Sequence, residues 1–169
     1  WPYNEIAMTI PVMANASFSP PVLPMLASDV FKRFGYYVFG MPVTSRENQM
    51  RGNKLWGLPK VTRDIDITTN DERCDTVAKG EDGQPYFSLS VPTQGKATRF
   101  DVRGHLFSSL NERILKSRTC FLGEFQVNKY MKTLLKPGLQ PDREWLKIGQ
   151  GKDAAILREL AIEPHPFQF

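Results

Sequence analysis

The strongest constraint on the fold is an alternation of side-chain character that begins after Lys60. One face of the segment 61–68 carries Val61, Arg63, Ile65 and Ile67. The opposite face carries Thr62, Asp64, Asp66 and Thr68. This period of two is typical of a β-strand. A turn at 70–71 precedes a second strand over 72–79, and the sequence Gly80-Glu81-Asp82-Gly83 predicts a hairpin that leads into a third strand.

Strand character also recurs elsewhere in the chain. We predict strands over 3–12 (ended by Pro11), 36–41, 97–103, 119–127 and 143–148. Short strands separated by turns at intervals of about 8–12 residues favour an antiparallel sheet that closes on itself. The predicted fold class is therefore α+β, mainly antiparallel β, as a closed or cone-like β-barrel with a few short helices. At 169 residues and 41% hydrophobic, we expect residues 1–169 to form a single domain.

The clearest helix signal lies over residues 45–56. Thr44 followed by Glu47 reads as a capping box, Gly57 supplies a C-terminal stop, and Pro59 prevents continuation. Gly52 inside this helix costs about 1 kcal/mol relative to alanine, and close packing against a strand would account for it. Two shorter helices are predicted over 27–34 and 153–160.

Lys60 stands in an unusual place for a lysine. It follows a Gly-Leu-Pro corner and opens the alternating strand, so its amine can be held inside a pocket. A free lysine has a pKa near 10.4, and only about one amine in two thousand is neutral at pH 7. A nucleophilic lysine needs that pKa lowered by about 3–4 units, which burial or a nearby ammonium can achieve.

Two segments resemble the acetoacetate decarboxylase family. Residues 52–61 (GNKLWGLPKV) resemble its catalytic segment, and residues 3–12 (YNEIAMTIPV) resemble the strand that carries a glutamate into its active site. Between them, 37–42 reads as the family's following strand. The resemblance implies that Lys60 forms a Schiff base with a β-keto acid, and that Glu5 moves protons or positions the substrate. It also implies self-association into a homo-oligomer.

The chain departs from the family pattern at several positions. Val61 stands where the family usually has a second lysine, but neighbouring side chains on a strand point to opposite faces, so little is lost. Asn53-Lys54 replaces Arg-Glu, and Leu58 replaces an aromatic residue. An N-terminal portion is expected to be absent, and with it the family's substrate-binding arginine.

Three residues complete the predicted site. Arg63 is a candidate substitute for the missing arginine, and Trp56 and Met41 are candidate substrate contacts. Each has a plainer alternative that the sequence leaves open: Arg63 as a salt-bridged arginine, Trp56 as core packing, Lys60 as a surface lysine and Glu5 as an exposed strand residue.

Composition argues against several other classes of function. The net charge of +4 arises from scattered basic residues without a nucleic-acid-binding motif, so we expect no nucleic-acid partner. No apolar run of about 18 residues is present, so we expect no membrane partner, and we find no signal-peptide pattern. Cys74 and Cys120 are expected to be buried thiols in a cytoplasmic protein. His105 and His165 lack ligand-like spacing, so neither a metal nor another cofactor is expected.

The sequence therefore predicts a lysine-dependent lyase that acts on a small keto acid, foremost a decarboxylase that converts a β-keto acid to a ketone and carbon dioxide. Two alternatives stay open. One is an aldolase- or dehydratase-like member of the same family, and the other is a non-catalytic domain that binds a small ligand.

Overall fold

The computed structural model describes residues 2–16, 33–127 and 146–161. The chain divides into two compact units, and each is considered separately. Unit 1 comprises residues 1–62 and 100–123, and unit 2 comprises residues 63–99 and 124–169. The expectation of a single domain over 1–169 stays a prediction.

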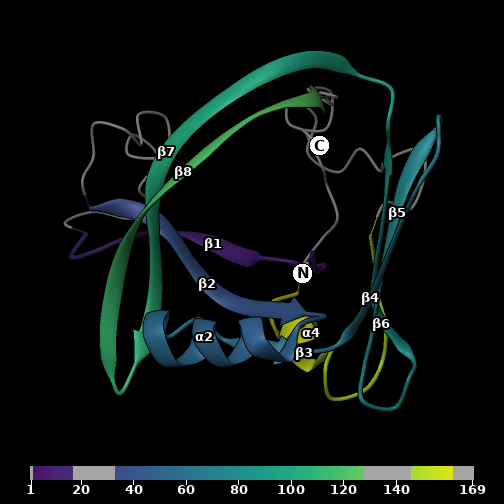
Figure 1. The fold of residues 1–169 in the computed structure, drawn as a ribbon. Coiled ribbons are helices and arrows are strands. Elements are labelled where there is room, and N and C mark those ends of the chain that lie inside the picture. Colours follow the sequence, from purple (N-terminus) through teal and green to yellow (C-terminus); the bar gives the residue numbers. More distant parts are fainter. Residues whose placement is uncertain (1, 17–32, 128–145, 162–169) are drawn as a thin grey trace. The chain divides into compact units, whose positions relative to one another are not determined.

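The sheet that carries unit 1 is built around β2 (Phe34–Val43). Its strand order is β1 (Met8–Met13), β2, β7 (Lys96–Leu110) and β8 (Arg113–Val127), and β3 (Lys60–Thr62) also pairs with β2. Helix α2 (Arg46–Trp56) connects β2 to β3 (Figure 1). Pro11 lies inside β1, where the strand at the end of the sheet tolerates a missing donor.

An extra residue in β2 decides which of its side chains face the core. The register with β1 passes from Gly40 opposite Met8 to Val38 opposite Thr9, so Phe39 is bulged. Val38 and Met41 are three positions apart and would face opposite sides of a regular strand. Because the bulge inserts one residue, both join a buried cluster with Val43, against which Leu58 and Leu106 pack.

The hairpin of β7 and β8 is longer than the sequence predicts. Each strand has 15 residues, whereas only 97–103 and 119–127 carry a strand signal. A two-residue turn connects the strands, with positive φ angles of 49° at Asn111 and 63° at Glu112. This backbone usually selects glycine at the second position, and glutamate gives no sequence signal for it.

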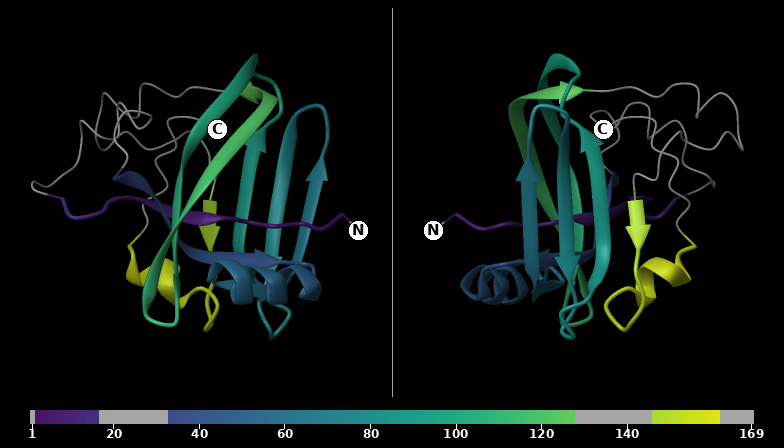
Figure 2. Two further views of the ribbon diagram at one scale, coloured as in Figure 1. Left: turned by 60° about the vertical axis from the view of Figure 1, so that its left-hand side comes forward. Right: turned by 90° about the vertical axis from the view of Figure 1, so that its right-hand side faces the viewer.

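Unit 2 contains a second sheet with the order β4 (Asp64–Thr69), β5 (Arg73–Lys79), β6 (Pro85–Pro92) and β9 (Leu146–Ile148), followed by helix α4 (Ala155–Glu159). Strands β4, β5 and β6 lie side by side (Figure 2). Their antiparallel pairing and the turns between them confirm the hairpins predicted from the alternation. Among the described residues of this unit, the buried ones are Ile65, Ala78, Tyr86, Val127, Ala154 and Leu157.

Several expectations differ from the structure. The fold is mainly β with short helices, as predicted, but the described strands form two sheets and not one closed barrel. The strand predicted over 61–68 is interrupted at Arg63, between β3 and β4. Residues 27–32 of a predicted helix, 143–145 of a predicted strand and His165 lie outside the described residues, and Phe34 belongs to β2.

The start of α2 also corrects the sequence prediction. Ser45 is the N-cap, and its hydroxyl accepts a hydrogen bond from the backbone N–H of Asn48 at 3.2 Å. The Thr44 hydroxyl instead accepts from the backbone N–H of Asn4 at 2.9 Å. Glu47 pairs with Arg51 one turn later. The N-cap is therefore Ser45 and not Thr44, because a contact distant in sequence engages Thr44, and Glu47 does not take part in a capping box.

Both cysteines are free thiols, but Cys120 is exposed and Cys74 only half-buried, so the expectation that both are buried is wrong. Neither helix in the described ranges has the length and apolar character needed to cross a membrane.

Candidate functional site

Among the described residues, Lys60 is the one charged residue that the fold buries. It is the first residue of β3 and retains 5% of its exposure. The corner before it forms because Gly57 adopts a left-handed conformation, with φ of 57°, that ends α2. A β-carbon on Gly57 would lie 2.5 Å from the carbonyl oxygen of Ser109, so both backbone shape and space require glycine there. The corner thus directs the Lys60 side chain toward α2, where its stem contacts Gly52.

Glu5 approaches the Lys60 amine from a segment distant in sequence. Its Oε2 lies 2.5 Å from Lys60 Nζ. Glu5 forms an antiparallel bridge with Val43, and the next backbone N–H, that of Ile6, donates to the carbonyl of Pro42 at 3.1 Å. The Glu5 side chain is 28% exposed, so this ion pair is only partly shielded from water.

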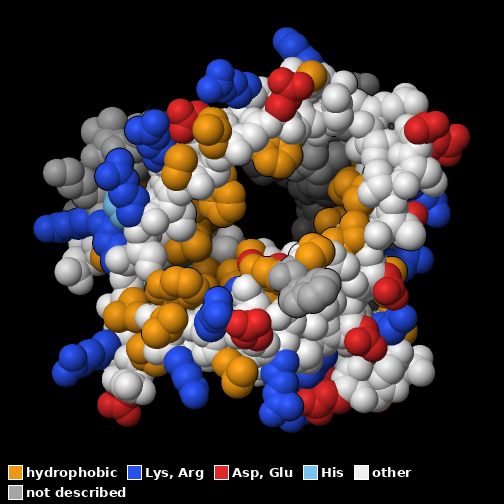
Figure 3. All heavy atoms as spheres, in the orientation of Figure 1, with side chains coloured by type: hydrophobic (Ala, Val, Ile, Leu, Met, Phe, Trp, Pro, Cys, Tyr) orange, Lys and Arg blue, Asp and Glu red, His pale blue; other side chains and the backbone are white. Residues whose placement is uncertain are grey.

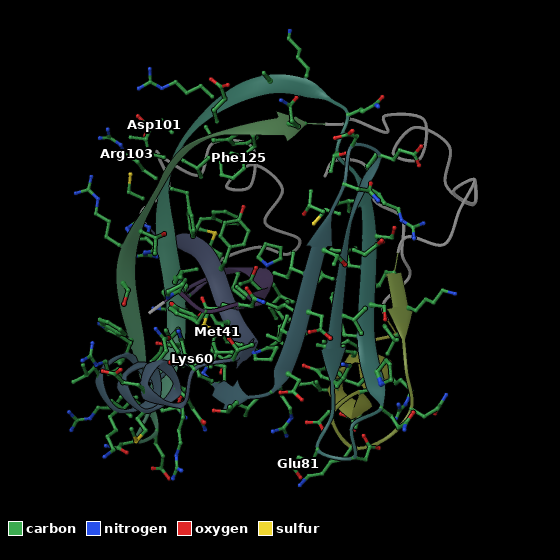
Figure 4. The ribbon with its side chains drawn as sticks, turned by 45° about the vertical axis from the view of Figure 1, so that its right-hand side comes forward. Met41, Lys60, Glu81, Asp101, Arg103 and Phe125 are labelled. Carbon is green, nitrogen blue, oxygen red and sulfur yellow. The ribbon has the colours of Figure 1, made fainter. Side chains whose placement is uncertain are left out.

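The sheet register explains why Lys60 and Glu5 meet. Lys60 pairs with Met41 on the parallel strand β2, and Glu5 pairs with Val43. Paired residues of neighbouring strands project to the same face of a sheet, as do residues two apart on one strand. All four side chains therefore share one face, and Met41 and Lys60 lie next to one another beside α2 (Figure 4).

Helix α2 presents polar and small residues to this face, and its large apolar residues are exposed. The buried or half-buried positions are Asn48, Gln49, Gly52 and Asn53. Met50, Leu55 and Trp56 are exposed. Figure 3 shows hydrophobic side chains gathered over the region of unit 1 where α2 and the β7–β8 hairpin lie. The contact between α2 and β3 consequently depends on carboxamides and close backbone approach.

Each carboxamide of this helix face has its own partner in β3. The Asn48 Oδ1 accepts a hydrogen bond from Lys60 Nζ. The Gln49 Oε1 accepts from the hydroxyl of Thr62 at 2.6 Å. Asn53 donates to the backbone carbonyl of Lys60 at 3.0 Å and accepts from its backbone N–H at 3.1 Å. The Asn53 side chain thus forms hydrogen bonds with both the backbone N–H and the backbone carbonyl of Lys60, as a neighbouring strand would.

Gly52 gives the lysine stem its space. A β-carbon at this position would lie 2.5 Å from Cδ and 2.8 Å from Cε of Lys60. The sequence predicted close packing of Gly52 against a strand, and the structure confirms it. At Gly52, helix α2 packs against the side chain of Lys60, the candidate catalytic residue.

The remaining groups around the amine are aromatic and polar. Nζ lies 5.7 Å from the ring centroid of Tyr3, within cation–π range. With a carboxylate on one side and a carboxamide oxygen on another, every hydrogen-bond partner of Nζ among the described residues is an acceptor. Nζ therefore has one charged and one neutral acceptor beside it.

Trp56 is not part of the core, which the plainer of its two sequence interpretations requires. It is 52% exposed, so it is not core packing. Its contribution to unit 1 is through the backbone, because its carbonyl accepts a hydrogen bond from the buried Ser108 hydroxyl at 2.5 Å. This bond connects the end of α2 to β7. Substrate contact by Trp56 stays a prediction.

Arg63 belongs to unit 2, where its guanidinium is engaged by two carboxylates. Asp153 Oδ1 accepts from Nε at 2.9 Å and from one terminal nitrogen at 2.6 Å, and Glu81 accepts at 3.0 Å. Burial alone would lower the pKa of Arg63, but the hydrogen bonds and charges of Asp153 and Glu81 raise it above its usual value. Arg63 is therefore a salt-bridged arginine, which is the plainer of its two sequence interpretations.

Sequence reasoning missed Asn48 and Asn53. Asn53 was noted only as a departure from the family pattern. The signal that could have found them is their spacing: Asn48, Gly52 and Asn53 lie on one face of a helix that ends just before Lys60. A helix face of amides and glycine that is followed by a buried lysine indicates polar contacts to that lysine.

Comparisons with known proteins give one likeness of fold. No protein family and no curated protein matches the chain. The structure is similar to the crystal structure of acetoacetate decarboxylase from Legionella pneumophila, with a TM-score of 0.46 and 10% sequence identity over 75% of this chain. This chain spans 46% of the length of that protein, which carries the name of the family that the sequence resembles.

Proposed function

We propose that this protein is a lyase that forms a Schiff base between Lys60 and a small keto acid, and that decarboxylation of a β-keto acid is its foremost reaction. The observation that carries the proposal is the pairing of a 95%-buried lysine with a carboxylate 2.5 Å away, at a corner that resembles a family catalytic segment. Burial favours a neutral, nucleophilic lysine amine, and the adjacent carboxylate is placed to take its proton.

The first half of the reaction uses Glu5 as a base and then as an acid. The Lys60 ammonium gives a proton to the Glu5 carboxylate, and the neutral amine attacks the ketone carbon. The ketone oxygen collects two protons by way of Glu5 and leaves as water. An iminium then connects Nζ to the substrate.

The second half uses the iminium as an electron sink. The bond between the α-carbon and the carboxylate breaks, its electron pair moves toward the nitrogen, and carbon dioxide leaves. The resulting enamine takes a proton on carbon. Glu5 is ionised at this stage, so it relays that proton from solvent water, and its Oε2 lies 2.5 Å from Nζ. Water then hydrolyses the new iminium and releases the ketone. No cofactor enters this scheme.

Trapping with cyanoborohydride tests the proposal. Incubation with acetoacetate or pyruvate should yield a reduced adduct that peptide mass spectrometry places on Lys60. Lys60→Met keeps an unbranched stem against Gly52 and should give no adduct. Lys54→Met, at an exposed position of α2, is the matched control and should react like the wild type. Absence of any adduct on wild-type Lys60 would refute Schiff-base chemistry.

One observation favours the non-catalytic alternative. The acceptors around Nζ also suit a permanent ion pair that holds residues 4–6 against the end of β2. Under that alternative, Lys60→Met destabilises unit 1 but the wild type forms no adduct. If adducts form, release of carbon dioxide from acetoacetate distinguishes a decarboxylase from an aldolase- or dehydratase-like enzyme.

A further inference from the structure

The carboxamide of Asn48 has one end engaged and the other end available beside the reactive nitrogen. Its Oδ1 accepts from Lys60 Nζ, and its backbone N–H is satisfied by the Ser45 hydroxyl. Among the hydrogen bonds within the described part of the chain, none uses the Nδ2 amino group. The assignment of the two ends follows from chemistry, since an N–H donor on Lys60 requires an oxygen opposite it.

The position of Asn48 is fixed from several directions. It is the third residue of α2, in the turn that Ser45 caps. One turn further along, Gly52 lies against the stem of Lys60, and Asn53 holds the lysine backbone. These contacts hold the Asn48 carboxamide in place relative to Nζ. A preorganised donor of this kind contributes to catalysis because no reorganisation is needed during the reaction.

We infer that Asn48 is a further catalytic residue, whose Nδ2 donates a hydrogen bond to the carbonyl oxygen of the substrate as Lys60 attacks. This inference rests on the proposed function and assigns a residue that the sequence resemblance did not include. Asn48 and Glu5 then have different roles: the Asn48 carboxamide stabilises charge on the substrate oxygen, and the Glu5 carboxyl group moves protons.

The step balances with the groups present. The Nζ lone pair forms a bond to the carbonyl carbon, and the π electrons of the carbonyl move to its oxygen. The Asn48 N–H is hydrogen-bonded to that oxygen while it is negatively charged. Glu5 delivers its proton to the oxygen, takes a proton from the nitrogen, and returns it as the hydroxyl leaves as water. No oxidant, metal or further reactant is needed.

The variant Asn48→Asp removes the donor. It has the same shape and keeps an oxygen toward Nζ, but it replaces the amino group with an acceptor. With acetoacetate and cyanoborohydride, we expect the rate of Lys60 adduct formation to fall at least about tenfold, since loss of one oxyanion donor costs about 10²–10³ in rate. Gln49→Glu is the matched control, because it makes the same chemical change one residue away, where the partner is Thr62. Its rate should stay within about twofold of wild type.

The outcomes separate the inference from the proposed function. Wild-type protein that forms no Lys60 adduct overturns both. Wild-type protein that forms the adduct, with Asn48→Asp reacting at the same rate, overturns the role of Asn48 alone. An equal loss in Gln49→Glu would also overturn it, since charge on this helix face would then explain the effect. If Asn48→Asp fails to fold by circular dichroism, Asn48→Ala removes the donor without adding charge and should show the same loss.

Discussion

A β-carbon on Gly52 would lie 2.5 Å from Cδ of Lys60, so the candidate catalytic side chain occupies space that only a glycine in α2 leaves open. The helix accepts a residue of poor helix propensity, and the lysine stem gains a close neighbour along its length. Stability and the position of the amine are therefore coupled at this contact.

Gly52→Ala should displace the Lys60 side chain. The alanine gains about 1 kcal/mol of helix propensity, but crowding in a packed site costs about 1–3 kcal/mol. We expect a net loss of roughly 1 kcal/mol in urea unfolding, and a fall of at least about tenfold in Lys60 trapping. The control is Gly104→Ala in β7, where a β-carbon would meet nothing within 4 Å. Unchanged trapping in Gly52→Ala would argue against the coupling.

Asn53→Ala should loosen the start of β3. It removes both hydrogen bonds to the backbone of Lys60, and each typical bond contributes about 0.5–1.5 kcal/mol. We expect about 1–3 kcal/mol lower unfolding free energy and faster amide hydrogen exchange at Lys60. Lys54→Ala, on the exposed side of the same helix, should change the unfolding free energy by less than about 0.5 kcal/mol. Equal effects of the two variants would contradict the backbone role of Asn53.

The two carboxylates that engage Arg63 should differ in their effect on stability. Asp153 has a side chain only 20% exposed and accepts two bonds from the guanidinium, whereas the Glu81 side chain is 69% exposed. Asp153→Ala should lower the unfolding free energy by about 1–3 kcal/mol. Glu81→Ala should cost less than about 1 kcal/mol, as exposed pairs usually do. A larger loss from Glu81→Ala in urea unfolding would be inconsistent with these geometries.

Tyr86 should make the stability of unit 2 sensitive to alkaline pH. Burial and the nearby charge of Asp153 raise its pKa to about 12, although Arg63 acts in the opposite direction. A phenol whose pKa is higher in the folded state contributes fully below the unfolded value near 10. That contribution is lost as the pH rises from about 10 to about 12, and amounts to roughly 2–3 kcal/mol.

The comparison with Tyr86→Phe isolates this effect, because other tyrosines and lysines also titrate in the same range. The wild type should lose about 2–3 kcal/mol more than the variant between pH 9 and pH 12 in urea unfolding. Parallel pH profiles for the two proteins would rule out the contribution of Tyr86.

Local patterns in the sequence were sufficient for many of the elements. The β4, β5 and β6 hairpins follow from side-chain alternation and from turn residues, and α2 follows from its Gly57 stop and a polar N-cap within one residue of the predicted one. The corner that presents Lys60 is local as well, because Gly57 and Pro59 restrict the backbone directly. Such features depend on residues within a few positions of one another, so the local sequence is enough to predict them.

Tertiary structure alone decided the rest. Lys60 and Glu5 are 55 residues apart, and only the register of β2 with β3 and with residues 4–6 brings them to one face. The bulge at Phe39, the contact with Asn4 that engages Thr44, and the separation of the strands into two sheets also depend on distant partners. A single residue of register moves a side chain to the other face of a sheet, and no local pattern sets that register. The sequence by itself determined that a lysine would open a strand, and the assembled sheet and helix determined what surrounds its amine.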